Sequence, residues 1–438
     1  MHRIHVIAGI FIAPLLFVAT LTGFLYALAP SLEKAVYHEQ MSAPVAAQGV
    51  APLPIADQVR AAEKARPGDE ADAVEVAGDA AHTTRVLFND PSLISKSYKH
   101  AVFVDPGDGS VRGDEVQYGS SDALPFRAWL SEGHRRLWLG EPGRLYSEAA
   151  ASWMGALTIG GLWLWWDRCR RKRNHSTTRR GRLMRNHAWV GVVVALGLLF
   201  LTATGLTWSS VAGANIATAR EHLNWIAPKP ETTISAPASP AAPAADGASP
   251  ASPAWEQADR VLDTARAEGL DGKLILTPPE GEGEAWTVKE ARQEWRTDMN
   301  TITVDGATGS VVDEVRWSDW PIMAKMAEWL INAHMGILFG WVNQLLLALL
   351  ALGLGAMIVW GWLMWFARNR HAYRAGSLPR PVGWGRVPPM LIVLCVIYSL
   401  IAPLFGITLV IFLLGDGIYQ HFRARRAHER PRARAHAD

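Results

Sequence analysis

The sequence predicts an internally duplicated α-helical membrane protein with two α+β modules outside the membrane. Three observations lead to this fold class: several apolar runs have membrane length, the sequence repeats within itself, and both copies contain histidines at matched positions. A parallel duplication of this kind predicts four core helices related by a pseudo-two-fold axis, followed by a fifth, C-terminal helix.

The repeat has two registers, one for each half of the repeating unit. The unit is helix, extramembrane domain, histidine, helix. The matched pairs are His134 with His334 and Gly161 with Gly361 at an offset of 200, and His5 with His187 and Gly9 with Gly191 at an offset of 182. A function for this chain must therefore explain four histidines at equivalent points of a duplicated scaffold.

The apolar runs define the expected membrane helices. They cover roughly residues 4–29, 149–166, 188–211, 341–366 and 389–414. Each run is long enough to cross about 30 Å of hydrocarbon at 1.5 Å per residue. The first run matches the interior segment 187–208, so we interpret it as a retained helix and not as a cleaved signal peptide.

Charge is segregated, although the formal net charge is only +2. The segments 168–186 and 367–387 are rich in arginine and poor in acids. By the positive-inside rule both segments are cytoplasmic, which also places the N-terminus in the cytoplasm and the long segments 30–145 and 212–335 outside.

The resulting domain organisation has ten parts. They are helix one at 1–29, the first outer module at 30–145, helix two at 146–167, a basic loop at 168–186, helix three at 187–211, the second outer module at 212–335 with a Pro/Ala-rich linker at 228–253, helix four at 336–366, a basic loop at 367–387, helix five at 388–415 and a basic tail at 416–438.

The fifth helix leaves two arrangements open. A single kinked span over 388–415 places the basic tail outside. Pro403 and Gly406 alternatively make a bent or re-entrant segment that keeps the tail inside. About 27 residues is too short for two full crossings, and we favour one kinked span.

Each outer module combines a helix with short alternating strands. Helices are expected at 55–65 and 255–267. Strands are expected at 84–88, 99–104, 286–288 and 301–304. In each module a strand leads into an Asp-to-Gly turn, beginning at Asp105 and Asp305, which we interpret as structural.

The four matched histidines point to a cofactor. His5 and His187 begin helices on the cytoplasmic side, whereas His134 and His334 precede helices on the outer side. An axis along the membrane normal brings each pair face to face, as bis-histidine ligation of b-type haem requires. We therefore expect two haems b, with these four histidines as the iron ligands.

Two glycines support a planar cofactor at the cytoplasmic pair. Gly9 and Gly191 each follow a histidine by four residues. They therefore lie on the same helical face, where a missing side chain leaves room for a macrocycle.

No other catalytic residues stand out, because the sequence contains no P-loop, GxSxG, HExxH or dinucleotide fingerprint. The expected partners are lipid and a separate cytoplasmic or quinol electron donor, without nucleic acid.

These motifs resemble a known family, the bacterial PepSY-associated transmembrane proteins, which include ferric-siderophore reductases and iron-regulated inner-membrane proteins. The matching stretches are His5-x-x-x-Gly9, Thr22-Gly23-x-x-Tyr26, His134-Arg135-x-Leu137-x-x-Gly140, His187-x-x-x-Gly191, Thr204-Gly205-x-x-Trp208 and His334-x-Gly336-x-Leu338-x-Gly340-x-x-Asn343-Gln344. The outer modules are similar to PepSY domains.

The resemblance implies a dihaem reductase that passes electrons across the membrane to ferric iron in periplasmic siderophore complexes and releases Fe(II). It also implies that His5, His187, His134 and His334 hold the haems. The alternatives are a non-enzymatic PepSY regulator or binding protein, which predicts a colourless protein, a transporter of iron or siderophore, and a quinol-linked cytochrome b with another acceptor.

Overall fold

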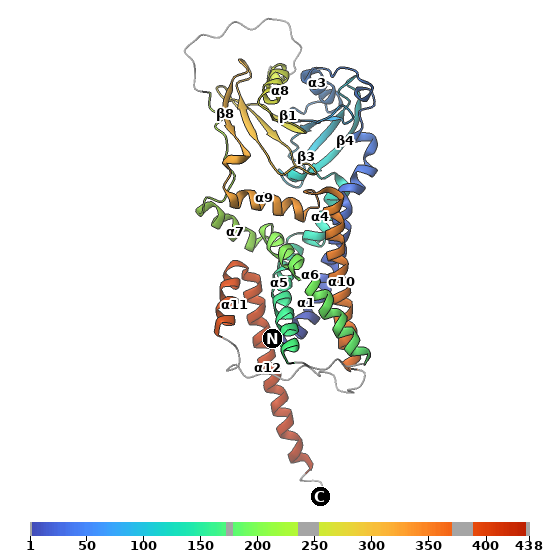
Figure 1. The fold of residues 1–438 in the computed structure, drawn as a ribbon, viewed down its shortest axis with the longest axis vertical. Coiled ribbons are helices and arrows are strands. Elements are labelled where there is room, and N and C mark those ends of the chain that lie inside the picture. Colours follow the sequence, from blue (N-terminus) through green and yellow to red (C-terminus); the bar gives the residue numbers. More distant parts are fainter. Residues whose placement is uncertain (1, 172–177, 235–253, 370–388, 435–438) are drawn as a thin grey trace. The chain divides into compact units, whose positions relative to one another are not determined.

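A computed structural model describes residues 2–171, 178–234, 254–369 and 389–434 (Figure 1). Most of the expected linker at 228–253 and of the basic loop at 367–387 lies outside the described residues, as do positions 172–177 of the first basic loop and the end of the tail.

The chain divides into two compact units. The helical unit comprises Met1–Gly23, Glu132–His222 and Leu349–Asp438. The sheet unit comprises Phe24–Ser131 and Leu223–Ala348. Each unit is built from segments that are distant in the sequence. The reason is that each outer module is inserted between two consecutive membrane helices.

Among the described residues, four helices are long and apolar enough to cross a membrane. They are α1 (His2–Val36), α6 (Arg179–Thr207), α10 (Gly340–Asn369) and α12 (Pro403–Arg434), of which α12 is sufficiently apolar over Pro403–Phe422. The expected second span lies in α5 (Gly140–Arg170), which has 31 residues but is not among these four helices. The structure thus agrees with a mostly helical membrane protein.

Helix α1 continues past the expected end at residue 29, through Pro30 to Val36. Tertiary contacts hold this extension within the sheet unit. Glu33 accepts a hydrogen bond from the Leu124 backbone N–H at 2.8 Å and pairs with Arg127 at 3.2 Å. The free energy of these contacts offsets the loss of the helical hydrogen bond that Pro30, which has no N–H group, cannot donate.

Helix α6 starts at Arg179, eight residues before the expected start of helix three at 187. The Thr178 hydroxyl caps its first turn by accepting a hydrogen bond from the Gly181 N–H at 3.2 Å. An N-cap of this type stabilises the start of a helix. The arginines from Arg179 to Arg185, which were expected in the basic loop at 168–186, are therefore helical. His187 consequently lies about two turns inside the helix.

The expected single kinked helix at 388–415 is instead two helices, α11 (Pro389–Ile401) and α12. They pack against one another in opposite directions (Figure 1). A Cβ added to Gly406 would lie only 2.7 Å from the Ser399 Cβ. The glycine therefore permits the close approach of α12 to α11. With 13 residues, α11 is too short to cross a bilayer, and the chain reverses direction at Ala402.

The sheet unit contains one antiparallel sheet of eight strands in the order β4-β3-β2-β1-β5-β6-β7-β8. The strands are β1 (Ala71–Val76), β2 (Thr84–Phe88), β3 (Tyr98–Val104), β4 (Val111–Tyr118), β5 (Leu274–Thr277), β6 (Trp286–Glu290), β7 (Thr301–Val304) and β8 (Val311–Val315). The two outer modules therefore join edge to edge. At the junction β1 pairs with β5, and Val74 lies opposite Leu276.

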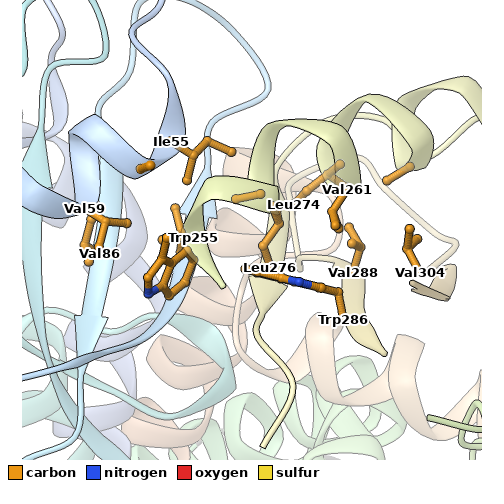
Figure 2. Close-up of a cluster of buried hydrophobic side chains, with 14 of the residues drawn as sticks. Ile55, Val59, Val86, Trp255, Val261, Leu274, Leu276, Trp286, Val288 and Val304 are labelled. Carbon is orange, nitrogen blue, oxygen red and sulfur yellow. The ribbon is translucent and has the colours of Figure 1, made fainter. Parts of the chain in front are cut away.

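Two helices cover one face of this sheet. They are α3 (Ile55–Ala65) and α8 (Ala258–Ala267), the latter preceded by a 3-10 turn at Trp255–Gln257. Figure 2 shows their apolar side chains packed with those of the strands. The rings of Trp255 and Trp286 meet edge to face, with centroids 5.3 Å apart, and both are at most 1% exposed. One shared core thus connects the two modules.

Shorter helices connect these elements. They are α2 (His38–Met41), α4 (Pro125–Arg136), α7 (Val211–His222) and α9 (Ile322–His334), with further 3-10 turns at Ala46–Gln48, Gly119–Ser121 and Trp317–Asp319. In the helical unit, the Glu148 carboxylate accepts hydrogen bonds from the N–H groups of Val211 and Ala212, at 2.8 and 2.9 Å. This buried carboxylate therefore caps the start of α7.

The shared core predicts a large effect of replacing Trp286, whose side chain is fully buried. We expect Trp286→Ala to destabilise the sheet unit by about 3–5 kcal/mol because it leaves a cavity where two modules meet. Thermal unfolding of the full chain, followed by circular dichroism, measures the change. Ile94→Ala is the control, because Ile94 is 82% exposed. Equal melting temperatures for the two variants would contradict a shared core.

Candidate haem-ligand histidines

His5 and His187 lie together in the helical unit. They come from α1 and α6, and their ring centroids are 6.3 Å apart with an interplanar angle of 89°. Two imidazoles that bind one metal ion from opposite sides, with nitrogen–metal distances of about 2.0 Å, have ring centres roughly 6.4 Å apart. At the observed separation both imidazoles could hold the same iron. The sequence predicted this pairing.

The backbone of α10 orients His187. Its Nδ1 donates a hydrogen bond to the Met357 carbonyl at 2.9 Å, with the proton placed on Nδ1 by the carbonyl partner. Metal-binding histidines commonly use one ring nitrogen in this way and leave the other as the ligand. The Met357 side chain also approaches the next turn of α6, because a Cβ on Gly191 would lie 3.2 Å from its Cε.

His5 packs against two glycines of α5. A Cβ added to Gly161 would lie 3.2 Å from the His5 Cε1, and one added to Gly160 would lie 3.9 Å from its Nδ1. The Leu157 carbonyl interacts with the ring. Nevertheless, within the described part of the chain, the buried Nδ1 of His5 forms no hydrogen bond of normal geometry.

The two predicted cradle glycines differ in their surroundings. A Cβ added to Gly9 would meet no atom within 4 Å, so this position opens into free space, as room for a macrocycle requires. Gly191 instead faces the Met357 side chain. Gly9 thus fits its expected role, whereas the space beside Gly191 depends on the position of one flexible methionine.

His134 lies near the end of α4, in the helical unit. Its Nδ1 donates to the Ala19 carbonyl of α1 at 2.9 Å, and the Thr22 hydroxyl lies 3.4 Å away. A Cβ on Gly23 would lie 2.8 Å from its Cε1, so only glycine fits here. Burial lowers the pKa of His134, partly opposed by the Ala19 carbonyl and reinforced by Arg135. The imidazole is therefore neutral at pH 7, the form that binds iron.

The two histidine positions of the helical unit lie at different levels along α1, one near its start and one near its middle. His5 is near its start, whereas His134 contacts it at Ala19 and Gly23. Eighteen residues of helix separate His5 from Gly23, which corresponds to about 27 Å. His334 is the last residue of α9 in the sheet unit. Its pairing with His134 stays a prediction.

His5 and His187 are the residues of the helical unit that would hold a haem, since each offers one imidazole and the two rings lie close together. Two imidazoles alone leave most coordination positions unfilled, whereas a porphyrin supplies four nitrogens and needs two axial ligands. The open space at Gly9 agrees with this interpretation.

Sequence reasoning missed the groups that orient these rings. Two are backbone carbonyls, of Met357 and Ala19, which carry no side-chain signature. The role of Gly161 was also missed, although its match with Gly361 was visible in the repeat. The two glycines are equivalent in the repeat, so the sequence could not show that they differ. A Cβ at Gly161 would meet the His5 ring, whereas a Cβ at Gly361 would meet no atom within 4 Å.

Comparison with known protein families identifies the family of this chain. The family model described as PepSY-associated TM region matches residues 2–368. The chain therefore belongs to this family of membrane proteins. No match is found among curated proteins.

The contact between α5 and His5 predicts a selective effect of a larger side chain. Gly161→Val should displace the His5 ring, and we expect it to lower the haem content of the purified protein by up to one per chain. Gly361→Val is the matched control, because a Cβ at Gly361 meets no atom within 4 Å. Equal haem content in both variants would contradict the proposed position of His5.

Proposed function

We propose that this protein is a dihaem b-type membrane reductase. The observation that carries the proposal is the His5–His187 pair, whose ring centroids are 6.3 Å apart and whose second ring is oriented by the Met357 carbonyl. When bound, a haem supplies a one-electron carrier at this position. His5 and His187 would hold the iron, the surrounding helices half-bury both residues, and the Met357 carbonyl fixes the tautomer of His187.

The proposal assigns the second haem to His134 and His334. His134 supports it through its hydrogen bond to the Ala19 carbonyl, which places the ring proton on Nδ1 and fixes the orientation of the ring. Internal duplication with pseudo-two-fold symmetry completes the argument. The sheet order supports it, since each module runs outward from the β1–β5 junction. The Leu157 and Met357 carbonyls, 200 residues apart, also interact with matched histidines.

The two levels of α1, at His5 and at Gly23, then serve the two sides of the membrane. The rise of about 27 Å between these two levels is close to the thickness of the hydrocarbon core. In the proposed orientation, the N-terminus and the His5–His187 pair lie on the cytoplasmic side of the bacterial inner membrane. A cytoplasmic reductase or quinol supplies electrons there.

Ferric iron in a periplasmic siderophore complex is the proposed acceptor. Each electron reduces one Fe(III) to Fe(II). Hard oxygen ligands hold the more highly charged ion more tightly, so the added electron loosens the complex. Membership of the PepSY-associated family, together with the paired histidines, supports this acceptor over a non-enzymatic regulator, which leaves the histidines without a role.

Haem content tests the histidine assignments. The purified full-length protein should contain about two haems per chain, with a low-spin b-type spectrum. His5→Ala and His187→Ala should each remove the same haem, and His134→Ala should remove the other. His38→Ala is the control, because His38 is exposed and has no matched histidine. A colourless wild-type protein, folded with haem in excess, would overturn the proposal.

Reoxidation tests the acceptor. Dithionite-reduced protein, freed of excess reductant, should be reoxidised by a ferric hydroxamate siderophore, with one Fe(II) formed per electron. The gallium complex of the same siderophore is the control, because Ga(III) has the charge of Fe(III) but accepts no electron under these conditions. Reduced protein that stays reduced with ferric hydroxamate and ferric catecholate siderophores would refute the acceptor while leaving the haem assignment intact.

A further inference from the structure

A cavity of about 300 Å³ lies in the sheet unit where the two modules join. Its strand residues, among them Glu75 and Ile275, alternate with the core residues Val74 and Leu276, so the cavity opens on the face opposite α3 and α8. The lining residues are Ala73, Glu75, Leu87, Lys96, Ser97, Lys99, Gln117, Gly119, Ser120, Asp122, Ile275 and Thr277. This volume is at the lower end of the range for small-molecule sites.

A connected polar network forms the base of the cavity. The Gln117 amide donates to Glu75 at 2.6 Å and to Asp122 at 3.2 Å. Lys273 pairs with the same two carboxylates, at 2.5 and 2.7 Å. Glu75 is only 1% exposed, and its charge is compensated. The base is thus rigid, and its acids are occupied by the protein itself.

The pKa of Asp122 reflects the same compensation. Burial raises the pKa, but Lys273 and Arg85 outweigh burial and bring the pKa below its usual value. Asp122 is therefore ionised at neutral pH and stays paired, so it does not repel an incoming anion as an unpaired carboxylate would.

The lysines at the rim differ in their pairing. Lys99 pairs with Asp72. Lys96 also lines the cavity but forms no ion pair with any residue in the described ranges. Three residues with hydroxyl groups, Ser97, Ser120 and Thr277, also line the cavity. An unpaired ammonium beside several hydroxyls is a suitable binding environment for an oxyanion.

The polar character of this cavity is not a requirement of the repeated fold. At an offset of 200, Gln117 and Asp122 correspond to Trp317 and Ile322 in the second copy. The second module therefore forms its part of the sheet without these polar groups. The first copy carries a buried polar network, which costs free energy to assemble unless every group is satisfied.

We propose that the junction cavity binds a small organic carboxylate, with Lys96 as its main contact. The serine and threonine hydroxyls donate hydrogen bonds to the carboxylate oxygens, and the apolar lining residues Leu87 and Ile275 contact the carbon skeleton. The ligand is either a free carboxylate or a carboxylate chelate of a trivalent metal. Binding requires neither haem nor electron transfer.

Isothermal titration of the purified full-length protein with citrate and with gallium citrate tests this site. Neither probe is redox-active, so the result does not depend on the proposed reductase activity. We expect saturable binding of at least one probe below about 1 mM and a loss of about tenfold in affinity for Lys96→Gln. Stronger binding of gallium citrate identifies a metal chelate as the ligand, whereas equal or stronger binding of citrate identifies the free carboxylate.

Lys64→Gln is the matched control, because Lys64 is exposed on α3, on the other face of the sheet. It removes the same charge and should leave affinity unchanged. Absence of saturable binding for both probes, or equal weakening by Lys64→Gln and Lys96→Gln, would overturn the proposal. A colourless protein that still binds either probe would refute the reductase but not this site.

Discussion

The close approach of His5 and His187 is the constraint on which the helical unit depends. Two imidazoles with centroids 6.3 Å apart require α1 and α6 to face one another, and each ring needs a supporting helix behind it. Helix α5 provides this support for His5 through Gly161, and α10 provides it for His187 through the Met357 carbonyl. Four helices are therefore arranged around one pair of side chains.

Two largely buried acids of the helical unit, Asp416 and Glu148, are each bound by a partner within that unit. Arg3 is two residues before His5 and pairs with Asp416 of α12. Ionisable residues in membrane helices are costly unless paired, and both side chains are largely buried here. The pair attaches α12 to the start of α1. Glu148 is similarly occupied by the backbone of α7. Neither acid is left as an uncompensated charge.

Sequence alone predicted the parts that depend on local pattern. The helix at 55–65 and the strands at 84–88 and 301–304 have the expected bounds because apolar periodicity sets them. The pairing of His5 with His187 followed from the repeat. The β1–β5 junction was not predicted, because choosing a partner for an edge strand is a non-local decision. Pro30 likewise failed to end α1, since contacts of Glu33 outweigh its local effect.

The angle between the two rings provides the most direct test of the central claim. The His5 and His187 planes are 89° apart. Low-spin ferric haem with perpendicular axial imidazoles gives a strongly anisotropic electron paramagnetic resonance signal with a large maximum g-value, whereas parallel rings give a rhombic signal. The measurement is the spectrum of the oxidised His134→Ala variant at liquid-helium temperature. A large-g signal is predicted, and a rhombic low-spin signal, a high-spin signal or no haem signal would contradict the proposal that His5 and His187 hold the iron in this arrangement.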